Sequence, residues 1–430
     1  MKIAYLLPGS GGSFYCGNCL RDKVFTKSLK QSGHDILMIP MYLPLSIDQC
    51  DADSPIFYGA VNIYLEQLSP IFKKMPHWLK KFLDSDKVLR FAAKQSGSTK
   101  AEGNESMTIS MLQGTHGKQS ENLDELIYWL KEHEKPDVVH LSNALLSGLA
   151  QKLKQELNCT VVCTLQDEDE WIDEMREPFA SQTWKLIESN AAYIDSFIAV
   201  SEYYAALIKS KIQIPAEKLH VVYNSIGIDT IRESKHDKNH HTIGYMSKIN
   251  SLFGADLLFD AFVELKKEKQ FSTLKLKYTG GYTDDFSKVV RTIKQKAKQN
   301  SIENDVEFFD DLSSIGKNKF LDSISILCVP SRRKEAFAIQ VLEAYAAEVP
   351  SILPNTGAYP EINNRSNAGL LYVPNDTKNL VNVLRELLTN EVLYHELKQN
   401  CHKAIQSVFN SREQSLQIIE IYNNAVFNKK

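Results

Sequence analysis

The sequence has no apolar run that approaches the ~20 residues needed to cross a bilayer, so we predict no transmembrane helix. The opening stretch, Met1 to Leu7, is too short for the apolar core of a signal peptide and runs directly into Pro8. We therefore expect a cytoplasmic protein. Peripheral contact with a membrane stays open.

The sequence has no excess of cationic over anionic residues, and it has few cysteines. The chain has 50 Lys and Arg against 53 Asp and Glu, a formal net charge of −3, which gives no electrostatic support for nucleic acid as a partner. The seven cysteines are an odd number and are spread over the chain, which argues against a disulfide framework.

Sequence patterns for a metal site are also missing. Cys16 and Cys19 form the one Cys-x-x-Cys pair, and no second pair completes a zinc site. A redox role for this pair and simple packing in a loop both stay open. His236, His240 and His241 cluster in a polar stretch that we interpret as a linker between domains. We predict no metal.

The sequence does contain a regular alternation of apolar runs and helical segments. At 430 residues the chain is long for one hydrophobic core, so two domains are expected. The alternation predicts an α/β fold. The apolar runs typical of buried parallel strands lie at 2–8, 35–40, 137–140, 160–165, 196–200, 219–223, 242–247, 274–278, 306–309, 324–329, 351–353 and 370–373.

The first two runs enclose a glycine-rich turn, Gly9 to Gly12, and a helix to about Gln31. This unit is Rossmann-like. Its glycines do not fit Gly-x-Gly-x-x-Gly, and no acid closes the second strand, so NAD is disfavoured. From about 43 to 124 the alternation is lost, which indicates an insertion in the first domain, with a polar and mobile stretch at 95–106.

The most informative stretch runs from Val329 to Glu361. An apolar run ends at Val329, and we expect a helix from about Phe337 to Ala347 before the strand at 351–353. Such a strand–helix–strand unit opens the helix N-terminus at the carboxyl ends of the strands. The N–H groups of Ala338 and Ile339 would suit a diphosphate there, helped by the preceding cations Arg332, Arg333 and Lys334.

Two carboxylates in this stretch call for separate roles. Glu335 lies at the expected mouth of the helix, and Glu343 lies about two turns along, roughly 80° around the axis. With phosphates at the mouth, the two acids could reach groups on different sides, such as a ribose hydroxyl for Glu343. The alternative is that both are ordinary acids of a helix surface.

Taken together, Glu335-x7-Glu343 after Pro-Ser and a basic run, Val349-Pro350, and Thr-Gly-x-x-Pro-Glu361 resemble the donor-site signature of retaining GT-B glycosyltransferases of the family 4 type. The resemblance implies that Glu335 contacts the donor sugar and Glu343 the nucleotide ribose. It implies a role for Gly11 and Gly12 in the cleft. The donor would be a nucleotide-diphosphate sugar, with UDP a candidate nucleotide, and no further cofactor is expected.

The resemblance also implies the architecture. We expect two doubly wound, Rossmann-like domains that face a cleft, with a C-terminal helix crossing back to the first domain. The expected parts are an acceptor-side domain at 1–228, a linker at 229–240, a donor domain at 241–410 and a returning helix at 411–430. The insertion would shape the acceptor side, its aromatic residues stacking on a sugar or packing among themselves. Segments 57–64 and 106–119 look like an uncharacterised bacterial subgroup.

The chain departs from the family pattern at several positions. The Arg and Lys that would bind the donor diphosphate are replaced by Lys248 and Phe253, and Gln166 stands where His precedes Asp167. One charge-assisted contact is worth ~1.5–3 kcal/mol, so the loss at Phe253 matters unless Arg332 replaces it. Asp167 is expected on the acceptor side.

Three functions remain open at this point. The first is a hexosyl-type retaining glycosyltransferase acting on a carbohydrate or glycoconjugate acceptor, with Glu335 and Asp167 as its catalytic candidates. The second is a catalytically degenerate relative that binds ligands or works with a partner protein. The third is a GT-B-shaped epimerase or phosphorylase, which the two glutamates favour less.

Overall fold

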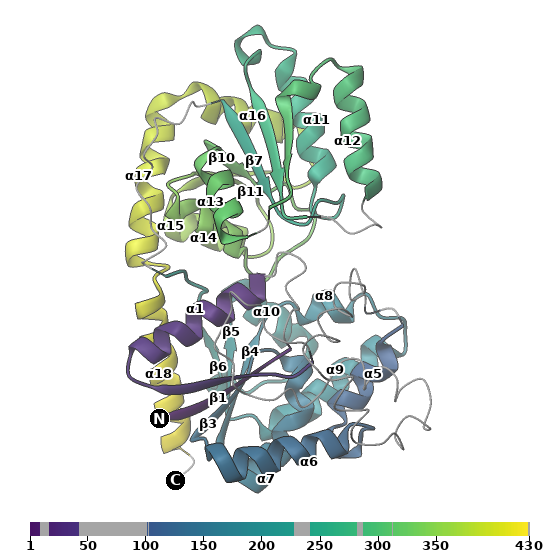
Figure 1. Ribbon diagram of the computed structural model, residues 1–430, viewed down its shortest axis with the longest axis vertical. Coiled ribbons are helices and arrows are strands. Elements are labelled where there is room, and N and C mark those ends of the chain that lie inside the picture. Colours follow the sequence, from purple (N-terminus) through teal and green to yellow (C-terminus); the bar gives the residue numbers. More distant parts are fainter. Residues whose placement is uncertain are drawn as a thin grey trace. The chain divides into compact units, whose positions relative to one another are not determined.

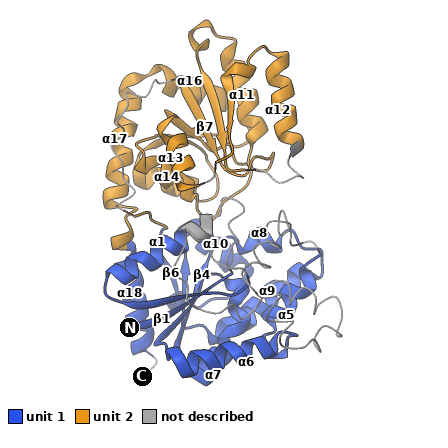
Figure 2. Ribbon diagram, viewed as in Figure 1, with its two compact units in different colours: residues 1–13, 18–223, 414–430 blue, residues 14–17, 224–413 orange. Residues whose placement is uncertain are grey.

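The computed structural model describes residues 1–8, 17–42, 101, 103–227, 241–281, 287–311 and 313–428. It forms two compact units, shown in blue and orange in Figure 2. Unit 1 consists of residues 1–13, 18–223 and 414–430, and unit 2 consists of residues 14–17 and 224–413. Unit 1 is therefore built from segments at both ends of the chain.

Unit 1 contains a six-stranded parallel sheet (Figure 1). Its near-continuous apolar strands suit a parallel sheet that is covered on both faces; β4, for example, is buried at every position. The strand order across the sheet is β2 (Asp35–Pro40), β1 (Lys2–Leu7), β3 (Val138–Leu141), β4 (Thr160–Leu165), β5 (Ser196–Ala199) and β6 (Leu219–Val221).

Helices cover both faces of this sheet. On one face α1 (Gly17–Gln31) and α18 (Ser411–Phe427) share a core with the strands, through Phe25 and Ile418 among others. The other α-helices among the described residues of unit 1 are α5 (Glu105–Leu112), α6 (Ser120–Trp129), α7 (Ala150–Leu157), α8 (Glu168–Ile172), α9 (Phe179–Asn190) and α10 (Glu202–Lys211).

Unit 2 repeats the doubly wound design with its own six-stranded parallel sheet. The strand order is β12 (Gly369–Tyr372), β11 (Ser351–Pro354), β10 (Ile326–Cys328), β7 (Thr242–Met246), β8 (Lys275–Thr279) and β9 (Val306–Phe309). Its helices are α11 (Ala255–Lys266), α12 (Ser287–Gln299), α13 (Ser314–Asp322), α14 (Ile339–Ala346), α15 (Tyr359–Ser366), α16 (Thr377–Thr389) and α17 (Glu391–Ser407).

The predicted α/β class and the doubly wound sheets are confirmed, and the helix expected from about Phe337 begins two residues later. α14 begins at Ile339 and not near Phe337, so Glu335 lies in the loop before the helix. The angle of roughly 80° expected between Glu335 and Glu343 therefore does not apply, because it assumed that both stand on one helix.

The expected insertion is only partly within the described residues, since 43–100 lie outside them. Its last part forms α5 and α6, and α5 packs against α9. Glu105 was expected in a mobile polar stretch, yet it is buried at the start of α5 and pairs with Arg176 at 3.1 Å. The carboxylate also accepts a hydrogen bond from the Gly103 N–H, which orders this end of the stretch.

The predicted return of the C-terminal helix to the first domain is confirmed. The Tyr422 hydroxyl of α18 lies 2.5 Å from Nδ1 of His140 in β3, and His140 Nε2 lies 2.7 Å from the Thr164 hydroxyl in β4. Burial holds the pKa of His140 well below its usual value, so the ring stays neutral. A chain of buried hydrogen bonds thus ties α18 to the centre of the sheet.

Replacing Tyr422 with Phe should lower the free energy of unfolding of unit 1 by about 1 kcal/mol, because His140 would keep its burial and lose its partner. Urea or thermal denaturation would measure the change. Tyr128→Phe is the matched control, since that side chain is 67% exposed. Equal stability of the two variants would show that the Tyr422 hydroxyl does not hold the helix.

Candidate functional site

The sheet of unit 2 has a topological switch point between β7 and β10. From β7 the chain winds outward through β8 and β9, and then returns to the other side of β7 to continue through β10, β11 and β12. Open α/β sheets bind ligands outside the carboxyl ends of the strands at such a point. The loops that follow β7, β8, β10 and β11 are therefore the candidate site.

Backbone contacts join these loops into one surface. The Arg332 N–H, after β10, donates to the Leu252 carbonyl, after β7, at 3.0 Å. The Ile249 N–H donates to the Gly281 carbonyl, after β8, at 3.0 Å. The loop after β11 joins on the other side, where the Ala358 N–H donates to the Glu335 carbonyl at 3.1 Å.

Gly254 permits the closest of these approaches. Its φ is +75°, and a Cβ at this position would lie 1.9 Å from the Pro330 carbonyl oxygen. A side chain would therefore force apart the loops after β7 and β10. The glycine at this position therefore has a steric reason that can be read directly from the structure.

The N-terminus of α14 lies in the loop surface. Ala338 caps the helix and Ile339 is its first residue, and both are buried. The first N–H groups of a helix have no intrahelical acceptor and carry the positive end of the helix dipole. The structure thus places Ala338 and Ile339 at a helix terminus, and phosphate binding by their N–H groups stays a prediction.

Glu335 precedes this terminus and faces buried aromatic hydroxyls. Burial, and then the negative charge of Glu335, raise the pKa of both Tyr245 and Tyr359 well above the usual tyrosine value. The Gln340 side-chain amide also lies 3.5 Å from Glu335 Oε2. Glu335 is thus placed among polar groups of three different elements, and not on the exposed surface of a helix.

Glu343 lies within α14 and forms an ion pair with Lys317 of α13. The Nζ and Oε1 atoms are 2.5 Å apart, and the two side chains are only 15% and 13% exposed. This burial argues against the alternative that Glu343 is an ordinary surface acid. The sequence did not predict Lys317 as the partner, because it lies in a polar stretch with another lysine nearby and no pattern distinguishes it.

The two cations expected near the diphosphate, Arg332 and Lys248, each contact another side chain of unit 2. Arg332 is bound by Asp256 of α11 through both nitrogens, at 2.7 and 3.1 Å, and also contacts the Ser251 carbonyl. Its charge is therefore already matched by a carboxylate. Lys248 lies over the ring of Phe253, 5.9 Å from the centroid, and Phe253 itself belongs to the hydrophobic core.

Unit 1 holds a second polar cluster, at the carboxyl ends of β3 and β4. Asp167 precedes α8 with a left-handed backbone, φ +54°. Next to it Glu168 is buried and accepts hydrogen bonds from the Ala144 and Gln166 N–H groups and the Tyr204 hydroxyl, at 2.7–2.8 Å. Burial raises the pKa of Glu168 to about 7. Among five polar residues in a row, the sequence did not reveal which acid would be buried.

Gln166 has a defined place in this cluster. Its side-chain amide donates to the Ser142 carbonyl at 2.8 Å, which links the ends of β3 and β4. Of the other predicted site residues, Gly11 and Gly12 lie outside the described residues, as do Cys16, His236 and His240. Lys248, Arg332, Glu335, Ala338, Ile339 and Glu343 all belong to unit 2.

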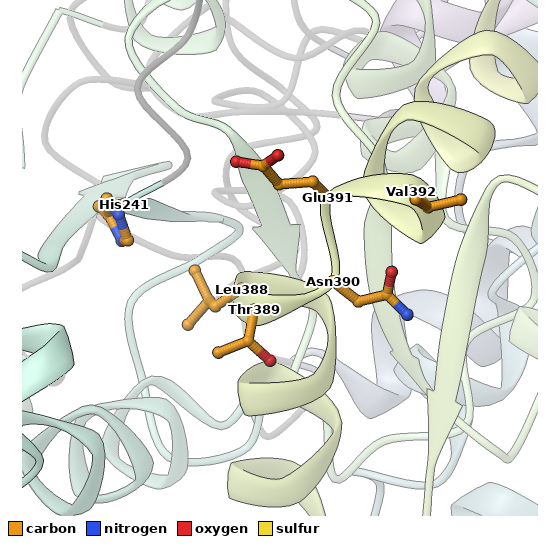
Figure 3. A pocket seen from close by; sticks show the side chains of 6 residues that line it. All are labelled: His241, Leu388, Thr389, Asn390, Glu391 and Val392. Carbon is orange, nitrogen blue, oxygen red and sulfur yellow. The ribbon is translucent and has the colours of Figure 1, made fainter.

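A hollow elsewhere in unit 2 lies apart from these loops. A hollow of about 460 Å³ is lined by His241 and by residues 388–392 of the α16–α17 turn (Figure 3). It lies at the amino end of β7, opposite the loops described above. Within the described ranges, no group of three His, Cys, Asp or Glu could hold a metal ion, and no helix is long and apolar enough to span a membrane.

Each unit contains a stretch that matches a known protein family. Residues 228–405 match the family described as glycosyl transferases group 1, and residues 111–230 match Glycosyltransferase Family 4. Each match covers less than half of the chain, and both are to glycosyltransferase families. The first match contains all the donor-site candidates of unit 2, and the second contains Asp167.

Individual proteins are similar to parts of the chain. N-acetyl-alpha-D-glucosaminyl L-malate synthase of Bacillus anthracis is 27% identical over 139 residues, which are 32% of this chain but only 36% of that protein. An uncharacterised glycosyltransferase of Methanocaldococcus jannaschii is 24% identical over 63% of this chain and 70% of its own.

Solved structures match along nearly the whole chain. Anabaena HepE in complex with UDP-glucose has a TM-score of 0.69 at 16% identity and covers 99% of this chain and 100% of its own. Sucrose-phosphate synthase from Thermosynechococcus elongatus has a TM-score of 0.69 at 14% identity, over 100% and 99%. The predicted GT-B fold is confirmed.

We expect Gly254→Ala to lower the free energy of unfolding by about 1–3 kcal/mol more than Gly33→Ala, because only the former adds a clash to an unfavourable φ. Gly33 has a φ of +84° but no atom within 4 Å of an added Cβ. Thermal denaturation of both variants measures the difference. If the two cost the same, the contact with Pro330 does not restrain the loops.

Proposed function

We propose that the protein transfers a sugar from a nucleotide-diphosphate sugar to a carbohydrate or glycoconjugate acceptor, with retention of the anomeric configuration. The observation that carries the proposal is the N-terminus of α14 at the switch point of unit 2, with Glu335 before it and Glu343 within it. The glycosyltransferase domains and the UDP-glucose complex of HepE support the same reading.

In this proposal the donor lies along α14. The diphosphate would accept hydrogen bonds from the N–H groups near Ala338 and Ile339, Glu335 would bind the hydroxyls of the sugar, and Glu343 would bind the ribose. A helix terminus contributes only ~0.3–2 kcal/mol. Cations must therefore share the charge of the leaving diphosphate.

Lys248 is the cation that we assign to this task. Arg332 was expected to help, but its bidentate pair with Asp256 already offsets its charge. We propose that Arg332 instead holds the loop after β10 against the start of α11, and that it reaches phosphate only if Asp256 releases it. Transfer would break the bond between the anomeric carbon and the diphosphate and form one to an acceptor hydroxyl on the same face of the sugar.

We place the acceptor with unit 1, where Asp167 and the buried Glu168 lie at the carboxyl ends of the strands. Asp167 would interact with the acceptor hydroxyl, and Glu168 would hold the backbone of the turn that presents it. No cofactor beyond the donor is proposed. UDP is the nucleotide that we propose to test first.

A second candidate function has an observation in its favour. The family that the chain resembles has a phosphate-binding Lys at the position of Phe253, whose side chain is packed into the core. The charge of Arg332 is paired with that of Asp256. Both features would weaken a donor site. A catalytically degenerate protein that binds a ligand or partner is therefore the alternative.

Nucleotide binding separates the two candidates. A ligand raises stability by RT ln(1 + [L]/Kd), about 2.7 kcal/mol at a hundredfold excess over Kd. We expect UDP, in a series with GDP and ADP, to raise the melting temperature, and Glu343→Ala to remove the rise because the ribose contact is lost. Glu264→Ala, an exposed position on α11, should keep it. No shift by any nucleotide at millimolar concentration would favour the degenerate protein.

Glu335→Gln should leave nucleotide binding intact and slow sugar transfer or donor hydrolysis by roughly two to three orders of magnitude. The control is Glu391→Gln, at the opposite end of the sheet. Proton NMR of the first product formed from a UDP-sugar reports its anomeric configuration, and we expect that of the donor. An inverted product, or an unchanged rate in Glu335→Gln, would contradict the proposed mechanism.

A further inference from the structure

We propose that Lys317 is a positioning residue of the nucleotide site, which holds Glu343 in the orientation that binds the ribose. This inference rests on the proposed function. Its structural basis is the ion pair between Lys317 Nζ and Glu343 Oε1 at 2.5 Å, in which both side chains are largely buried.

Lys317 projects from a turn that is fixed on several sides. The Ser313 hydroxyl caps α13 by accepting from the Gly316 N–H at 3.1 Å, and the Lys317 N–H donates to the Ser313 carbonyl at 2.9 Å. A Cβ on Gly316 would lie 2.2 Å from the Asp311 carbonyl oxygen, so this turn lies tightly against the end of the preceding loop.

The other end of α13 is held by the core. Phe320 and Leu321 are buried, and the ring of Phe320 packs edge-on against Phe309 of β9, with centroids 5.5 Å apart. The backbone that carries Lys317 is therefore set by packing and capping. Because the Lys317 side chain is already ordered against Glu343, ligand binding does not have to pay the entropy of ordering it.

A largely buried ion pair is a weak source of stability, because desolvation of the two charges offsets much of their attraction. Its geometry suggests a different use. The ammonium contacts Oε1 of Glu343; in this proposal that contact restrains the carboxylate, and Oε2 would accept from a ribose hydroxyl. Glu343 lies four residues after Ile339, roughly 6 Å along the helix, which suits a ribose next to a diphosphate at the helix N-terminus.

The test compares UDP with its 2′,3′-dideoxy analogue, which lacks the ribose hydroxyls. The measured quantity is the ratio of the two affinities, determined by calorimetry, so effects of Lys317 on charge or general stability cancel. We expect the wild type to prefer UDP, and Lys317→Met to lose about tenfold or more of this preference, the value of a charged hydrogen bond.

Two further variants complete the test. Lys319→Met removes an exposed cation from the same helix and should keep the wild-type ratio. Lys317→Arg retains the charge and should recover part of the preference, and it also serves if Lys317→Met does not fold. A wild-type ratio in Lys317→Met, or a reduced ratio in Lys319→Met, would overturn the positioning role.

The outcome also distinguishes this inference from the proposed function. If the wild type binds neither nucleotide, the donor site fails and the role of Lys317 fails with it. If the wild type binds both with equal affinity, Glu343 does not bind the ribose hydroxyls, so the ribose contact and the positioning role of Lys317 are both overturned while nucleotide binding itself stands. Loss of preference in Lys317→Met with binding retained supports both.

Discussion

The close approach of the loops after β7 and β10 is the constraint on which the donor site depends. Gly254 has no side chain to separate the loops, and the hydrogen bond from the Arg332 N–H to the Leu252 carbonyl joins them. Glu335 and the start of α14 follow directly on this contact. A glycine with positive φ therefore allows the close approach that, together with this backbone hydrogen bond, positions a helix terminus and a carboxylate.

The sequence predicted most of the strands because parallel strands buried on both faces have no alternating polar positions. The runs at 35–40 and 160–165 coincide with β2 and β4. The start of α14 was less readable. Phe337 and Ala338 are apolar like the helix that follows, so periodicity could not show that the helix begins after them.

The pairings of charged residues could not be predicted, because they join residues far apart in sequence. Arg332 meets Asp256, and Glu343 meets Lys317, only after the strands are placed in the order of the sheet. Glu168 illustrates a related limit: its neighbours are also acidic, and the tertiary contacts with Ala144 and Tyr204 decide which carboxylate is buried. Residue type gave the chemistry, and the fold assigned the partners.

The discontinuous composition of unit 1 has a consequence for the order of folding during synthesis. Its core includes Ile418, Ile421 and Tyr422, which follow the whole of unit 2 along the chain. As the chain leaves the ribosome, the first sheet must wait with an apolar face and His140 uncovered until α18 appears. The main segment of unit 2 runs unbroken from 224 to 413 and carries its core, so that core can form first and the unit that is made first is finished last.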